Sequence, residues 1–89
     1  MKMLWHPPGT DREIWVGDRD EVAALCGQPP EWGLTYAGYA RKGLPKTNPA
    51  PTAVTVDVET RRDMYPLDTV LAWDARRLGP GFRIRTDHR

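Results

Sequence analysis

The stretch Thr35-Tyr36-Ala37-Gly38-Tyr39-Ala40-Arg41-Lys42-Gly43-Leu44-Pro45 decides the fold, because it predicts a short helix that ends in a basic pair. Its two tyrosines and Ala40 share one face at helical spacing and face the core. The opposite face of the predicted helix, which faces solvent, carries Thr35, Gly38, Arg41 and Lys42. Gly43 and Pro45 end the helix. Cations near the end of an exposed helix contact phosphates or guanine edges, so the stretch predicts a DNA recognition helix.

An earlier helix is predicted to begin at Asp18, an N-cap candidate with Glu21 three residues later, as in a capping box. Val22, Leu25 and Cys26 follow at helical spacing, and Gly27 ends the helix. The segment Gln28–Gly33, with two consecutive prolines, interrupts any helix until Leu34. It is therefore predicted to be the turn between two helices.

The rest of the chain predicts a hairpin and a last helix. Val54–Val58 alternates apolar and polar residues as a strand does, and Met64-Tyr65 returns antiparallel to it, with Arg61 and Arg62 at the tip. Asp68 is predicted to cap the last helix. Val70, Leu71, Ala75 and Leu78 of this helix lie on one face, with Trp73 on its flank.

The N-terminal residues 1–13 show no periodicity and predict an irregular arm, followed by either a short strand or a hydrophobic staple at Ile14–Val16. Residues 83–89 are rich in arginine, and a basic C-terminal tail is predicted there. Trp15, Trp32 and Trp73 are interpreted as packing anchors.

The composition predicts one small domain without chemistry of its own. The 89 residues carry a net charge of only +1, but the excess of basic residues lies after residue 30. Cys26 stands alone with His6 and His88, so no metal and no cofactor are expected, and Cys26 is interpreted as a small core residue. No stretch approaches the roughly 20 apolar residues of a membrane span, so a cytoplasmic protein without catalytic activity is expected.

In order and spacing, these segments resemble the winged helix-turn-helix domains of the MerR-like and excisionase type. The resemblance covers about residues 14–83. It is carried by Leu25-Cys26-Gly27, by Thr35-Tyr36 with Tyr39 and the basic exit Arg41–Pro45, and by Tyr65 followed by Asp68-Thr69-Val70-Leu71-Ala72-Trp73. The Gly- and Pro-rich basic finish Ala75–Arg83 is also similar. Two features depart from the family pattern: the turn between Gly27 and Thr35 is longer, and the 46–63 stretch is long and contains acidic residues.

The resemblance implies a mainly α fold with a small β-hairpin, that is, about three helices plus a two-stranded wing, over residues 14–82. It also implies sequence-selective binding of double-stranded DNA by a small phage or mobile-element transcription regulator or an excisionase-like directionality factor. Because one module of this size makes few base contacts, a homo-oligomer or cooperative multimer on DNA is expected, and an integrase or host protein is a candidate further partner. The DNA-binding candidates are Thr35, Gly38, Arg41, Lys42, Lys46, Arg61, Arg62, Arg76, Arg77 and Arg83.

Each candidate has a plainer interpretation. Arg41 and Lys42 would also favour the negative end of the helix dipole, at about 0.3–1 kcal/mol. Arg61 and Arg62 would also suit a solvated turn, and the basic tail would also serve solubility. The nearly neutral net charge favours an alternative function, a module that docks on a host or phage protein without binding DNA.

Overall fold

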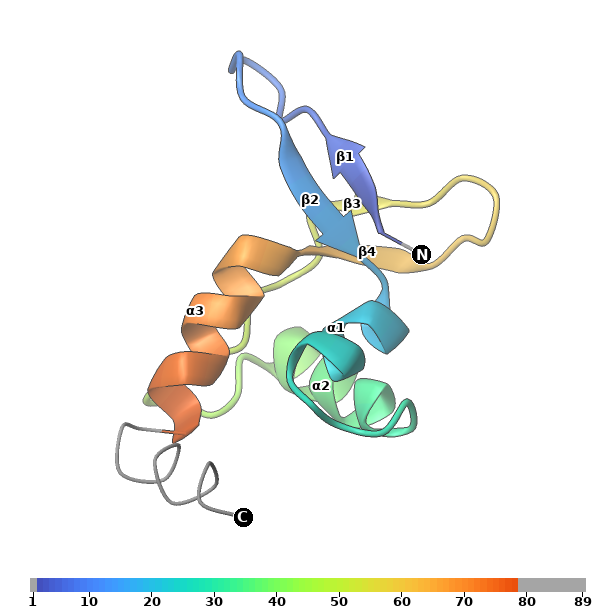
Figure 1. The fold of residues 1–89 in the computed structure, drawn as a ribbon. Helices are drawn as coiled ribbons and strands as arrows, with labels where there is room; N and C mark the ends of the chain where they lie inside the picture. Colours follow the sequence, from blue (N-terminus) through green and yellow to red (C-terminus); the bar gives the residue numbers. More distant parts are fainter. Residues whose placement is uncertain (1, 79–89) are drawn as a thin grey trace.

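The computed structural model describes residues 2–78 of the chain. In this part, two strands precede two helices, and two further strands lead into a third helix (Figure 1). The elements are β1 (Met3–Trp5), β2 (Ile14–Gly17), α1 (Arg19–Leu25), α2 (Trp32–Lys42), β3 (Thr55–Val56), β4 (Asp63–Pro66) and α3 (Leu67–Leu78). The predicted tail, including Arg83, lies outside the described residues.

All four strands form one antiparallel sheet in the order β1-β2-β4-β3. β4 joins the two hairpins, because its first half pairs with β3 while its second half pairs with β2, where Val16 lies opposite Pro66. The prediction of a mainly α fold with a two-stranded wing is therefore wrong. The described chain is a mixed α/β fold whose second hairpin is part of a larger sheet.

The N-terminal residues differ from the predicted irregular arm. Met3–Trp5 pairs with Ile14–Val16, and the resulting hairpin projects away from the helices (Figure 1). The Pro7-Pro8-Gly9-Thr10 segment makes the turn, with the Thr10 amide donating to the Pro7 carbonyl at 3.3 Å. Three strand residues are too few to show a period of two, and the adjacent prolines resemble a break rather than a hairpin turn.

The start of α1 is confirmed. Asp18 Oδ1 accepts hydrogen bonds from the amides of Asp20 at 2.9 Å and Glu21 at 3.1 Å, which satisfies two free donors of the first turn. The start of α2 differs, since this helix begins at Trp32 and includes Gly33. A Cβ atom at Gly33 would lie 2.6 Å from the Arg19 carbonyl oxygen. Glycine is therefore required here so that α2 can pack closely on the start of α1.

The last helix turns a different face inward than predicted. α3 begins at Leu67, so Asp68 lies in its first turn rather than at the cap. Val70, Trp73 and Asp74 are buried, whereas Leu71 is half exposed and Ala75 is exposed. The side chain of Leu78 lies outside the described part. The prediction is confirmed for Val70 but wrong for Leu71 and Ala75, because the fully buried Trp73, which was predicted on the flank, belongs to the buried face.

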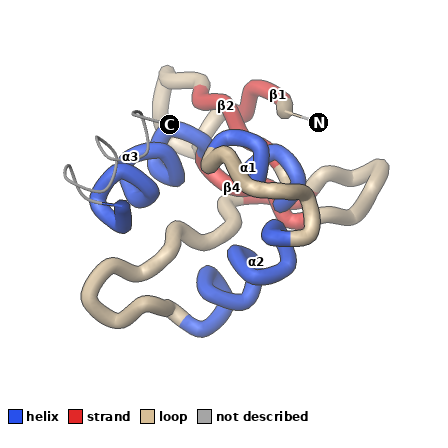
Figure 2. Tube along the Cα trace, turned by 60° about the horizontal axis from the view of Figure 1, so that its bottom comes forward, coloured by secondary structure: helices blue, strands red, loops and turns tan. Residues whose placement is uncertain are grey.

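The core is built on aromatic rings. The Tyr36 ring meets the Tyr65 and Trp73 rings edge-on, with centroid distances of 5.0 and 5.3 Å. Trp73 and Trp32 are packing residues as predicted, but Trp15 is 45% exposed and is not. Trp73 Nε1 donates to the Asn48 carbonyl at 2.7 Å. This hydrogen bond holds the long connection between α2 and the sheet against α3; Figure 2 draws the connection as a tan loop. The packing of Tyr36 against these rings therefore fixes which face of α2 is turned away from the core.

Candidate nucleic-acid interface

The outward face of α2 presents the predicted recognition residues. Thr35, Arg41 and Lys42 are exposed, and Gly38 lies between them, half buried, with no atom within 4 Å of the position that a Cβ would take. The opposite face buries Tyr36 and is fixed by the Tyr36 hydroxyl, which donates to the Pro51 carbonyl at 2.7 Å. This anchoring of the Tyr36 side of α2 therefore fixes which face of the helix points outward.

Beside this face lies an open hollow of about 250 Å³ that we call the arginine hollow. It lies where the start of α1, the outward side of α2 and the β3–β4 turn converge. Its lining consists of Arg19, Ala37, Arg41, Arg61, Arg62, Asp63 and Tyr65. Four guanidinium-bearing residues thus surround one space that has a single carboxylate in its lining. Arg41 belongs both to the hollow and to the outward face of α2.

The electrostatics of Tyr65 agree with this arrangement. Burial, and then the nearby carboxylate of Asp63, raise the pKa of the Tyr65 hydroxyl, while Arg19 and Arg41 act in the opposite direction. Arg19 and Arg41 therefore lie close enough to influence the floor of the hollow, although they come from different helices. Sequence reasoning missed Arg19, because only the pairing of β2 with β4, with Gly17 opposite Tyr65, places the start of α1 beside the hairpin.

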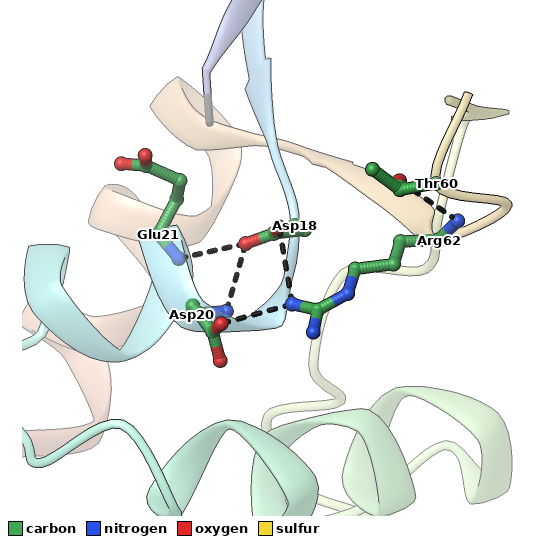
Figure 3. A network of polar contacts seen from close by, with 5 residues as sticks. All are labelled: Asp18, Asp20, Glu21, Thr60 and Arg62. Atoms are coloured by element: carbon green, nitrogen blue, oxygen red, sulfur yellow. Dashed lines mark hydrogen bonds and ion pairs between the residues drawn. The ribbon is translucent and has the colours of Figure 1, made fainter. Parts of the chain in front are cut away.

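Arg62 is already engaged with two carboxylates. Its Nη1 atom lies 2.9 Å from Asp20 Oδ2 and 3.3 Å from Asp18 Oδ2 (Figure 3). The hydrogen bond to Asp20, together with the negative charges of Asp20 and Asp18, raises the pKa of the Arg62 guanidinium. We call this contact the Arg62 latch, since it joins the β3–β4 turn to the first turn of α1.

Arg61 adopts a left-handed backbone conformation at the hairpin turn, with φ of 62°. Its amide donates to the Asp57 carbonyl at 2.7 Å, and the amide of Arg62 donates to Thr60 Oγ1 at 3.3 Å. The turn is therefore ordered by local hydrogen bonds as well as by the latch. The Arg61 side chain is exposed.

Other predicted DNA contacts lie apart from the hollow or serve the core. Arg77 pairs with buried Asp74 at 2.6 Å and lies 5.4 Å from the ring centroids of both Trp32 and Trp73. Arg76 donates to Asn48 Oδ1 at 3.3 Å. Lys46, in the connection after α2, is exposed and does not line the hollow. The predicted cations thus divide into a group near α2 and a structural group on α3.

Cys26 is buried, and burial, followed by the nearby Asp74 carboxylate, raises the pKa of its thiol to about 11. Within residues 2–78, no group of three or more His, Cys, Asp or Glu side chains is placed to hold a metal ion. No helix in the same part of the chain is long and apolar enough to cross a membrane.

No protein-family model, curated protein or solved structure matches this chain. The outward face of α2 and the arginine hollow are therefore the features from which a function is inferred.

Proposed function

We propose that this protein binds double-stranded DNA, with the outward face of α2 in the major groove. The observation that carries the proposal is Gly38, a half-buried glycine in the middle of the outward face of α2. Such a glycine is less stable than alanine by about 0.5–1 kcal/mol, and no contact within the described residues requires it. A helix face without a side chain at its centre lets another molecule approach the backbone closely.

The residues around Gly38 have the chemistry of a DNA contact. Arg41 and Lys42 are exposed cations that neutralise phosphates, and Thr35 donates to or accepts from bases or phosphates. One module of this size makes few base contacts, so selective binding calls for several copies along the duplex. A role as a small transcription regulator or directionality factor would follow from such cooperative binding.

The test is a fluorescence-anisotropy titration of a labelled mixed-sequence duplex of about 30 base pairs at two salt concentrations. Binding should weaken steeply as salt rises. Replacing Arg41 and Lys42 together by alanine should abolish it. A matched control replaces Lys2 and Arg12, two exposed cations of the first hairpin region, and should change binding little.

Two results would count against the proposal. Absence of binding by the wild-type protein even at low salt would refute DNA binding. Full retention of binding by the Arg41/Lys42 variant would mean that α2 is not the contact. In that case the two cations would serve only the helix dipole, and their loss would lower stability by about 0.3–1 kcal/mol each.

A second candidate function is protein binding, which the first hairpin favours. Leu4 and Trp15 lie directly opposite each other on β1 and β2, and they are 46% and 45% exposed. Under the DNA proposal, Trp15→Ser leaves duplex affinity unchanged. If the wild-type protein binds no duplex at low salt, this apolar pair becomes the leading candidate contact.

A further inference from the structure

Resting on the proposed function, we infer that the arginine hollow seats one phosphate of the DNA backbone beside the groove that α2 enters. Arg19, Arg41 and Arg61 hold the phosphate, and Arg62 is a positioning residue that does not contact it. This assignment adds Arg19 to the contact surface and removes Arg62 from it.

The composition of the hollow identifies the class of ligand. Like charges brought together around one space repel one another, and an anion in that space reverses the sign of the interaction. Arginine presents several N–H donors in a planar fork that matches phosphate oxygens. Asp63 is the one carboxylate in the lining, so it offsets only part of the positive charge. The three arginines come from α1, α2 and the hairpin turn, so that a phosphate between them would contact all three elements.

The Arg62 latch explains how the turn is held in place before any ligand binds. Asp18 is fixed as the N-cap of α1 by two amide hydrogen bonds, and its side chain is only 11% exposed. Arg62 reaches this fixed carboxylate and that of Asp20 from a position more than 40 residues away in sequence. Since Arg61 precedes Arg62 directly, the latch also sets the position from which Arg61 reaches the hollow.

The first experiment measures the slope of log K against log salt for the full-length protein and mixed duplex. Arg19→Gln and Arg61→Asn remove charge, and asparagine tolerates the left-handed backbone at position 61. Each variant should bind more weakly, and together they should make the slope shallower by about 1, as expected for one phosphate. The control Arg12→Ala should leave the slope unchanged.

Unchanged affinity and slope in the double variant would overturn the phosphate seat. A change of about 2 in the slope would overturn the assignment of a single phosphate, because two separate phosphates would then be involved.

The second experiment tests the Arg62 latch by asking whether the Asp20→Asn substitution tightens or weakens DNA binding. Asp20→Asn removes a negative charge near the hollow, which by electrostatics alone tightens binding of an anion. If Arg62 is a positioning residue, the same change removes the shorter of its two ion pairs, loosens the turn and weakens binding several-fold. Glu59→Gln, an exposed hairpin residue outside the latch, is the matched control and should tighten binding slightly. Tighter binding by Asp20→Asn would overturn the positioning role and return Arg62 to the DNA contacts.

A third experiment separates the seat from the proposed function. Inorganic phosphate is titrated into the wild-type protein at low ionic strength, and the Nε–Hε signals of the arginines are followed by NMR. Saturable shifts should be confined to Arg19, Arg41 and Arg61, while Arg62 and Arg77 stay unchanged. Absence of saturable shifts would overturn the seat. Such shifts in a protein that binds no duplex at low salt would overturn the DNA backbone as the source of the phosphate.

Discussion

Replacing Gly38 by alanine should make the protein more stable and weaken its DNA binding. Apart from its chain neighbours and the nearby backbone of α2, the added methyl group meets no described atom within 4 Å, so it introduces no clash with another element. Alanine is better than glycine in a helix interior by about 0.5–1 kcal/mol, partly because it restricts the unfolded chain. For a domain of this size, that gain raises the melting temperature by about 2–8 °C.

The same methyl group should obstruct the approach of α2 to DNA. Loss of one well-placed base contact costs about 1–3 kcal/mol, so the affinity should fall about fivefold or more. Thermal unfolding followed by circular dichroism gives the stability, and duplex anisotropy gives the affinity. The control Ala72→Gly, on the exposed side of α3, should lower stability by a similar amount and leave affinity unchanged.

Either of two results would refute this reasoning. A lower melting temperature for Gly38→Ala would mean that the glycine serves the fold. A higher melting temperature with unchanged affinity would mean that the outward face of α2 does not approach DNA closely.

Three further predictions concern the framework beneath the interface. Gly33→Ala should destabilise the protein by about 1–3 kcal/mol in urea unfolding, since its Cβ would collide with the Arg19 backbone; a stability equal to wild type would contradict the packing of α2 on α1. Arg77→Ala should lower stability, because it removes the ion pair with buried Asp74 at 2.6 Å, but the folded variant should bind duplex as wild type does. The Cys26 thiol, with its pKa raised to about 11, should react slowly with a disulfide reagent at pH 8 until denaturant is added, and fast reaction of the native protein would contradict its burial.

Because the pKa of the Cys26 thiol is raised in the folded protein, the free energy of unfolding should fall as the pH becomes alkaline. The folded state retains the thiol proton to higher pH than the unfolded state does. Its contribution to stability is therefore complete below the unfolded pKa of about 8.5 and is lost as pH rises toward about 11. Cys26→Ala should make urea stability less dependent on pH across this window, and an identical pH dependence would contradict the assignment.

Local signals in the sequence predicted local structure well. The Asp18 cap, the end of α2 at Gly43 with a left-handed φ of 69°, and the outward position of Thr35, Arg41 and Lys42 were all predicted from short-range patterns. These features depend on hydrogen bonds and side-chain spacing within a few residues, which a sequence displays directly.

Features that depend on long-range packing were not predicted. The pairing of β1 with β2 and of β2 with β4 joins segments that show no periodicity of their own. Likewise, Arg62 was predicted at an exposed tip, but its partners Asp18 and Asp20 come from a distant part of the chain. The predicted order of elements omitted β1, and the predicted two-stranded wing separated a hairpin that belongs to the four-stranded sheet.

The most direct test of the central claim is the salt dependence of duplex binding by the wild-type protein. If Lys42 contacts one phosphate and the arginine hollow, to which Arg41 belongs, holds another, the slope of log K against log salt should be about −2. A slope near zero, or no binding at about 50 mM salt, would contradict the account.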